Sequence, residues 1–147
     1  MKGKVQKMPY RYIPKPWVFS AVTDGVSVKV VPTFAPEHSN PQRCQYVWLY
    51  NVVIENQTDK RIKLMRRHWE VIDAHGQKQE IIAPGVVGEQ PVLEPGTAFT
   101  YISHTVLKTP TGFMKGDYDV VDDHGQRLKV NIPAFSLDEP SSRPLLN

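Results

Sequence analysis

Proline recurs along the whole chain and limits which secondary structure the chain can form. Inside a helix, proline removes a backbone hydrogen bond and clashes with the preceding turn. The 13 prolines leave few windows long enough for an α-helix. They stand at positions 9, 14, 16, 32, 36, 41, 84, 91, 95, 110, 133, 140 and 144. The chain is therefore expected to fold mainly from strands.

Apolar and polar residues alternate along several segments between the prolines, and a period of two is typical of a half-buried strand. The alternating apolar sets are Val26, Val28 and Val30; Tyr46, Trp48, Tyr50, Val52 and Ile54; Phe99 and Tyr101; and Leu128, Val130 and Ile132. Compact turns with glycine separate such runs at Asp73–Gly76, Glu94–Gly96 and Asp123–Gly125. These patterns predict an all-β sandwich of about seven strands.

The segment from Arg61 to Asp73 fits two descriptions. Its residues Ile62, Met65, Trp69 and Ile72 have helical spacing. Leu64, Trp69 and Val71 suit strands equally well. Because turns flank the segment and its surroundings are rich in strands, two short β segments are predicted here.

The basic character of the chain is concentrated in residues 1–19. Lysine and arginine occur there at Lys2, Lys4, Lys7, Arg11 and Lys15, with no acidic residue. Since the whole chain has a net charge of +3, these five cations leave −2 for the remainder. A net negative domain does not favour a nucleic-acid partner. We predict a basic, partly disordered extension over 1–19, a domain over 20–138 and a flexible tail over 139–147.

The bulk properties fit one globular domain. A chain of 147 residues can bury a core without a metal or disulfide. Its one cysteine, Cys44, excludes an intrachain disulfide and fits the reducing cytoplasm, which is the predicted location. No signal peptide and no apolar run long enough to span a membrane is found, so membrane insertion is not expected.

A long series of motifs resembles the ApaG family over about residues 20–138. The motifs are YNVVIEN at 50–56, RHW at 67–69, Asp73-x-x-Gly76, GVVGEQPVLEPG at 85–96, Phe99-x-Tyr101-x-Ser103, Leu107-x-Thr109-Pro110-x-Gly112-x-Met114-x-Gly116-x-Tyr118 and Ile132-Pro133-x-Phe135-x-Leu137. The resemblance implies an immunoglobulin-like or fibronectin-III-like sandwich, usually as a small free-standing bacterial protein. It also implies links to cobalt resistance, magnesium efflux and a diadenosine-tetraphosphate hydrolase gene. Related domains in eukaryotic F-box proteins look like protein-interaction modules.

The segment Ala83–Gly88 resembles a degenerate dinucleotide-binding loop. Such loops hold pyrophosphate because glycines let the backbone approach and a following helix aims its amides at the anion. Pro91 and Pro95 prevent that helix, and Glu89 would repel a phosphate. Backbone amides in a turn can still form an anion-binding nest. Gly85 and Gly88 are therefore candidate residues for binding pyrophosphate or a nucleotide, with Lys63, Arg66 or Arg67 supplying charge.

Neither metal binding nor catalysis has a recognisable motif. The histidines His38, His68, His75, His104 and His124 form no H-x-H pair and no metalloprotease helix. Asp117, Asp119, Asp122 and Asp123 fail the calcium-loop pattern. Ser103 and His104 are adjacent, so in a strand they point to opposite faces. No metal ligand, cofactor or catalytic residue is predicted, and the chain is not expected to be an enzyme.

Together these observations favour a protein-interaction module that binds another protein or itself. Sandwich domains bind partners through edge strands, end loops or exposed aromatic residues. The large aromatic residues Tyr46, Trp48, Tyr50 and Trp69 are either core or, if they lie on an outer face, a contact surface. The alternative is a binding module for pyrophosphate-containing nucleotides or divalent cations, linked to cobalt and magnesium homeostasis.

Overall fold

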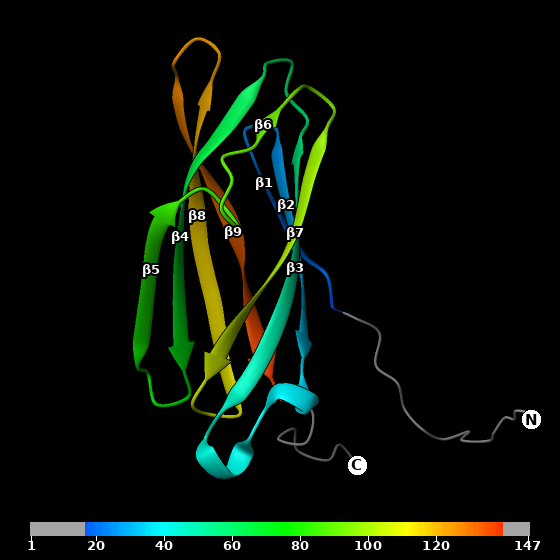
Figure 1. The fold of residues 1–147 in the computed structure, drawn as a ribbon. Helices are drawn as coiled ribbons and strands as arrows, with labels where there is room; N and C mark the ends of the chain where they lie inside the picture. Colours follow the sequence, from blue (N-terminus) through cyan, green and yellow to red (C-terminus); the bar gives the residue numbers. More distant parts are fainter. Residues whose placement is uncertain (1–16, 140–147) are drawn as a thin grey trace, which may run out of the picture.

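The computed structural model describes residues 17–139, which fold as a two-layer β-sandwich (Figure 1). The strands are β1 (Phe19–Thr23), β2 (Val26–Phe34), β3 (Tyr46–Asn56), β4 (Ile62–Asp73), β5 (Lys78–Pro84), β6 (Val92–Leu93), β7 (Ala98–Leu107), β8 (Thr111–Asp122) and β9 (Arg127–Asp138). Two short 3-10 helices, η1 (Pro36–His38) and η2 (Pro41–Arg43), connect β2 to β3. The predicted all-β sandwich is confirmed, with nine strands in this part of the chain where about seven were expected.

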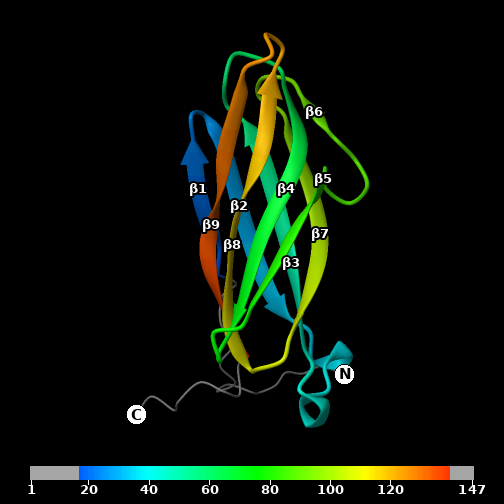
Figure 2. The same cartoon turned by 90° about the vertical axis from the view of Figure 1, so that its left-hand side faces the viewer.

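The first sheet has the strand order β1-β2-β3-β7, and the second has the order β5-β4-β8-β9. The two-residue strand β6 also pairs with β4, beyond the end of β5. Figure 2 shows that β1 and β9 lie on one side of the sandwich, while β5 and β7 lie on the other. The β1–β9 side is closed, because the Asn131 amide donates to Thr23 Oγ1 at 3.1 Å. The β5–β7 side has no such connection between strands in the described residues.

The core fills the space between the sheets with the side chains that alternation predicts. In β3, Trp48, Tyr50, Val52 and Ile54 are all buried. Trp69 packs against Tyr50 and Phe135, with ring centroids 5.2 and 6.1 Å apart. Aromatic burial on this scale contributes strongly to stability. The large aromatics Trp48, Tyr50 and Trp69 therefore belong to the core and provide no outer contact surface.

The predicted pair of short strands at 61–73 is wrong, because β4 is one strand of 12 residues. Its pairing with β8 shifts between Leu64 and Arg66, which leaves Met65 as an extra residue in a β-bulge. Before the bulge the even-numbered Leu64 is buried, and after it the odd-numbered Trp69 is buried. This change of phase within one strand produced the apparent helical spacing in the sequence.

Two hairpin turns confirm the predictions made from aspartate and glycine. In the β4–β5 turn, Asp73 Oδ1 accepts the amides of residues 75 and 77, and Gly76 has a φ of 81°. In the β8–β9 turn, Asp122 Oδ1, one residue before the predicted Asp123, accepts the amides of residues 124 and 126, and Gly125 has a φ of 79°. Both aspartates therefore close their turns, and both glycines adopt a conformation that other residues rarely take.

The predicted basic extension over 1–19 and the tail over 139–147 fall mostly outside the described residues. Only residues 17–19 and residue 139 of those segments are described. Across 17–139, no helix is long and apolar enough to cross a membrane.

Candidate functional site

The glycine loop after β5 is a tight backbone turn. Val86 and Glu89 exchange two backbone hydrogen bonds of 2.8 Å each. Between them, Val87 and Gly88 have positive φ values of 41° and 81°. A Cβ atom on Gly85 would lie 2.0 Å from the Glu89 carbonyl oxygen, a distance no side chain tolerates. Both glycines are thus explained by the shape of the turn.

The polar groups around this loop are already engaged within the protein. The Gly85 amide donates to the carbonyl oxygen of Met65, the bulged residue of β4, at 2.9 Å. The Arg67 guanidinium donates to the carbonyl oxygens of Pro84 and Gly85 at 3.0 and 2.9 Å. Arg66, another proposed source of charge, pairs with Asp119 at 2.7 Å. Anion binding at Gly85 and Gly88 stays a prediction, and it would have to compete with these contacts.

A second feature, which the sequence did not indicate, lies on the outer face of the second sheet. There the outward side chains of four neighbouring strands form a lattice of opposite charges, here called the charged face. Its members are Arg66, His68, Glu70, Lys78, Glu80, Lys115, Asp117, Asp119 and Lys129. The strand pairing brings these residues into neighbouring rows, because residues opposite each other in antiparallel strands share a face.

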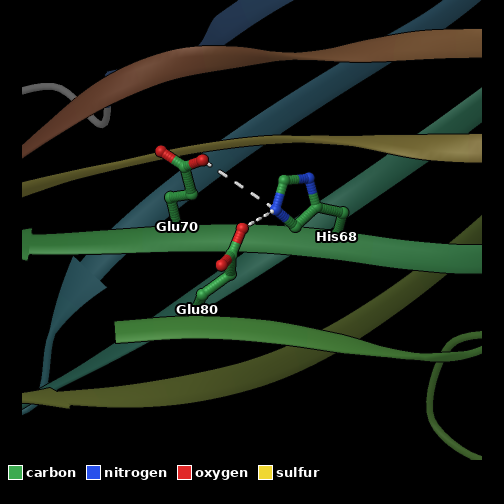
Figure 3. Close-up of side chains that lie close together, drawn as sticks. All are labelled: His68, Glu70 and Glu80. Atoms are coloured by element: carbon green, nitrogen blue, oxygen red, sulfur yellow. Dashed lines mark hydrogen bonds and ion pairs between the residues drawn. The ribbon is translucent and has the colours of Figure 1, made fainter. Parts of the chain in front are cut away.

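His68 lies among the carboxylates of the charged face, and Figure 3 shows it beside Glu70 and Glu80. Its Nε2 atom lies 2.6 Å from Glu80 Oε2 and 3.9 Å from Glu70 Oε2. Its Nδ1 atom lies 3.3 Å from Asp117 Oδ2 on the neighbouring strand β8. The hydrogen bond to Glu80, with help from Asp117, raises the pKa of His68 above its ordinary value, although burial opposes the shift. His68 therefore tends to carry a proton that neutralises these carboxylates.

The carboxylates around His68 are held by a further set of cations. Glu70 Oε1, which faces away from His68, lies 3.8 Å from Lys78 Nζ and 3.7 Å from Lys115 Nζ. Lys129 Nζ contacts Asp117 at 3.5 Å and Asp119 at 3.1 Å, and its bond to Asp119 is the main reason that the pKa of Lys129 is raised. Glu70 and Glu80 are directly opposite each other, a repulsive arrangement that these cations offset.

His68, Glu70 and Glu80 also have the composition of a metal site. One ligand atom from each lies within 4.8 Å of the others. A ligating histidine usually donates its second nitrogen to a carboxylate, which is the position of Asp117. No metal ligand was predicted from the sequence, and the sequence does not indicate this grouping, because its members come from β4 and β5 and form no sequence motif. The residues Asp122, Asp123 and His124 form a second, more exposed cluster in the β8–β9 turn.

The outer face of the first sheet has a different composition and is here called the neutral face. The name covers the outward side chains of the neighbouring strands β2, β3 and β7 and leaves out the short edge strand β1. They are Lys29, Val31, Thr33, Val47, Leu49, Asn51, Val53, Glu55, Ala98, Thr100, Ile102, His104 and Val106. Ile102 and Val106, both on β7, are 61% and 44% exposed. Lys29 and Glu55 are its only fully charged residues.

Strand β7 is also an open sheet edge. It pairs with β3 on one side, and no other strand of the described residues pairs with it. Its sequence AFTYISHTVL contains no proline, no glycine and no lysine, arginine or acidic residue. Proteins normally protect an edge with such residues, because the free backbone groups accept another strand. This edge of 10 residues therefore has no strand partner on its outer side in the described residues.

The residues considered for nucleophilic catalysis are not brought together with a base. Ser103 is half-buried on the core side of β7, whereas His104 is exposed on the outer side, as predicted. Cys44 is exposed at the end of η2. The buried hydroxyls of Tyr101 and Tyr118 bond each other, and burial raises the pKa of both phenols. These tyrosines remain protonated at neutral pH and belong to the core.

Comparison with known proteins places the chain in a family. The model of the ApaG domain matches residues 36–122. This chain belongs to the ApaG family. The ApaG protein of Rhodospirillum centenum is 49% identical over 126 residues, covering 86% of this chain and 97% of the relative. The ApaG protein of Methylocella silvestris is 45% identical over 130 residues, covering 88% of this chain and all of the relative.

Solved structures of similar proteins agree with the family assignment. A crystal structure of a Bordetella pertussis protein assigned as ApaA has a TM-score of 0.76 at 38% identity, covering 86% of this chain and all of that chain. An X-ray structure from a structural genomics consortium has a TM-score of 0.78 at 35% identity, covering 84% of this chain and 94% of that chain. The sandwich is therefore a fold shared with these two proteins.

Proposed function

We propose that this protein is a non-catalytic interaction module that binds another polypeptide strand along the free edge of β7. The observation that carries the proposal is the composition of this edge, which lacks proline, glycine and charge along its whole length. The backbone of an added strand would complete the hydrogen bonds of the edge. The exposed side chains of Ile102 and Val106 would supply apolar contacts.

The neutral face extends this surface beyond the edge. Val47, Leu49 and Val53 of β3 lie directly opposite β7 residues in the same sheet. A partner that pairs with β7 can therefore also cover half-buried aliphatic side chains next to it. Contact surfaces of proteins are distinguished by few charges at their centre. The charged face of the second sheet does not meet this description.

The test compares two lysine substitutions in the full chain. Ile102→Lys introduces a charge on β7, whereas Val22→Lys introduces the same charge at the other edge of the same sheet. The two positions are equally accessible, with exposures of 61% and 62%. In crosslinked pull-downs from native lysate, Ile102→Lys is expected to lose partners that Val22→Lys retains. Equal recovery with both variants would contradict binding through β7.

A second candidate function is divalent cation binding by His68, Glu70 and Glu80, favoured by the grouping of their ligand atoms. Imidazole and carboxylate ligands suit first-row transition metals such as Co²⁺ and Zn²⁺. Such a role would be consistent with the link to cobalt that the family resemblance implies. Because a ligating histidine must be deprotonated, binding would weaken as the pH falls below the raised pKa of His68.

Calorimetric titration with CoCl₂ or ZnCl₂ tests this second function. His68→Gln removes the central nitrogen ligand, and His124→Gln makes the same change in the exposed turn cluster. Saturable binding that is lost in His68→Gln and retained in His124→Gln is expected. Binding that is retained in His68→Gln would show that the cluster around His68 does not hold the ion.

Pyrophosphate or nucleotide binding by the loop at Gly85 and Gly88 has a separate test. Titration with millimolar pyrophosphate should shift the amide resonances of residues 83–90 in a heteronuclear NMR spectrum. Unshifted resonances would exclude the loop as an anion site.

A further inference from the structure

We propose that the strand that binds β7 is β7 of a second copy of this chain, so that two sandwiches share one continuous sheet across a two-fold axis. This inference rests on the proposed function, because it names the partner of the same edge.

The free backbone groups belong to the even-numbered residues of β7. The Asn56 amide donates to the Thr97 carbonyl oxygen at 2.9 Å, so the backbone of residue 97 faces β3. In an antiparallel pair, successive residues direct their N–H and C=O groups alternately to the two sides. The residues whose groups face away from β3 are therefore Ala98, Thr100, Ile102, His104 and Val106.

The other three sheet edges are protected. Strand β1 has only five residues and lies against β9. Strand β9 contains Pro133 and has an irregular register with β8. Strand β5 begins with Lys78, carries Glu80 and ends at Pro84. Each of these features is a known means of preventing strand addition, which leaves β7 as the open edge of the described residues.

Self-pairing about Ile102 matches the sequence of β7. Ile102 is the midpoint of the five free residues, so an axis through it pairs every free backbone group. In this register Ile102 faces Ile102 of the second copy, and Ala98 faces Val106. His104, the one titratable residue of the free edge, faces Thr100 and not a second histidine. No charges are opposed, so self-association requires no complementary charge from a different protein.

Pairing in this register buries the most exposed apolar side chain of the neutral face. Ile102 is 61% exposed in the single chain. Two copies of Ile102 would contact each other at the axis, because side chains of directly opposite residues lie on the same face. Even-numbered residues must pair with even-numbered residues of the second copy, because pairing them with odd-numbered residues would place outward side chains opposite core side chains.

Analytical ultracentrifugation of the full chain tests the dimer. We expect the wild type and Val22→Lys to dimerise at micromolar concentration, and Ile102→Lys to be monomeric, because its two ammonium groups would meet at the axis. Circular dichroism should show the same fold in all three proteins, since both positions are exposed. A wild type that stays monomeric, or a dimer that persists in Ile102→Lys, would overturn the inference.

Crosslinking tests the register without disturbing the edge. In a Cys44→Ser background, Ile102→Cys should form a covalent dimer, because opposite α-carbons of a hydrogen-bonded pair are about 5.5 Å apart. Val22→Cys in the same background should not. Absence of the Ile102→Cys dimer would reject this register. If the wild type is monomeric while Ile102→Lys still loses partners in the pull-down, the second copy is excluded and the proposed function stands.

Discussion

The two outer faces of the sandwich have the same strand geometry and different chemistry. On the second sheet, His68 contacts Asp117, and Glu70 and Asp117 contact lysines, so these three residues have partners within the molecule. On the first sheet, Ile102 and Val106 remain exposed beside an edge without charge. A face whose polar groups are satisfied internally gains little from a partner, whereas an open apolar edge gains both hydrogen bonds and burial.

The edges of the two sheets also differ, because β5 carries charged residues and β7 carries none. The largest expected effect concerns the loop that follows β5. Gly85→Ala would force a Cβ atom into the Glu89 carbonyl, so we expect the free energy of unfolding to fall by about 3 kcal/mol. Gly88→Ala has open space and only an unfavourable φ, with an expected loss of about 1 kcal/mol. Urea denaturation measures both. Equal losses would mean that the close contact at Gly85 does not govern the turn.

The next effect compares a new charge on each face. Val53→Lys on the neutral face removes apolar burial and faces Lys29, so a loss of about 1 kcal/mol in the free energy of unfolding is expected. Asn131→Lys on the outer face of the second sheet faces Asp117, and its free energy of unfolding should stay within about 0.5 kcal/mol of wild type. Val53→Thr controls for shape. If both lysines are tolerated equally, the faces do not differ energetically as proposed.

A pH-dependent effect is expected from His68. Its folded-state pKa is raised, chiefly by Glu80, so its charge stabilises the fold fully below the unfolded pKa, and that stability is lost as the pH rises through the folded pKa. Relative to His68→Gln, wild type should gain up to about 1 kcal/mol near pH 6 and almost nothing near about pH 9. Denaturation at several pH values measures this difference. A difference in stability that does not change with pH would show that the charge of His68 does not contribute to the stability of the fold.

The smallest effect is that of salt. Raising NaCl to about 0.5 M should reduce the contribution of His68 at pH 6 by a few tenths of a kcal/mol, because exposed ion pairs are screened. The fraction of dimer at fixed protein concentration should not fall, because the edge of β7 carries no charge pair. Sedimentation at low and high salt provides the comparison. A dimer that dissociates in salt would indicate that charges hold it.

Much of the fold was predictable from local sequence. Alternation placed Val52 and Ile54 in the core, and the aspartate–glycine pairs marked both hairpin turns. The segment at 61–73 was not predicted correctly, because Met65 forms a bulge only when β4 pairs with β8. A bulge inverts the side-chain phase, and a single strand read by itself contains no partner from which to detect that inversion.

The candidate sites also differ in whether their residues are close together or far apart in sequence. Gly85 and Gly88 are close together in sequence, so sequence analysis could propose them as candidate binding residues. The structure explains both by the shape of the turn. His68 and Glu80 are 12 residues apart, and Asp117 is 49 residues from His68, so no motif could join them. Their grouping depends on the register of three strands, which long-range pairing sets.

The sequence by itself determined the class of fold and the positions of the turns, because prolines, glycines and alternation act over a few residues. Its series of motifs carried the resemblance to the ApaG family. Only the tertiary structure decided which outward residues become neighbours and which edge stays open. Whether β7 lies at the margin of its sheet is a property of strand order, since the same ten residues would be covered on both sides in the middle of a sheet.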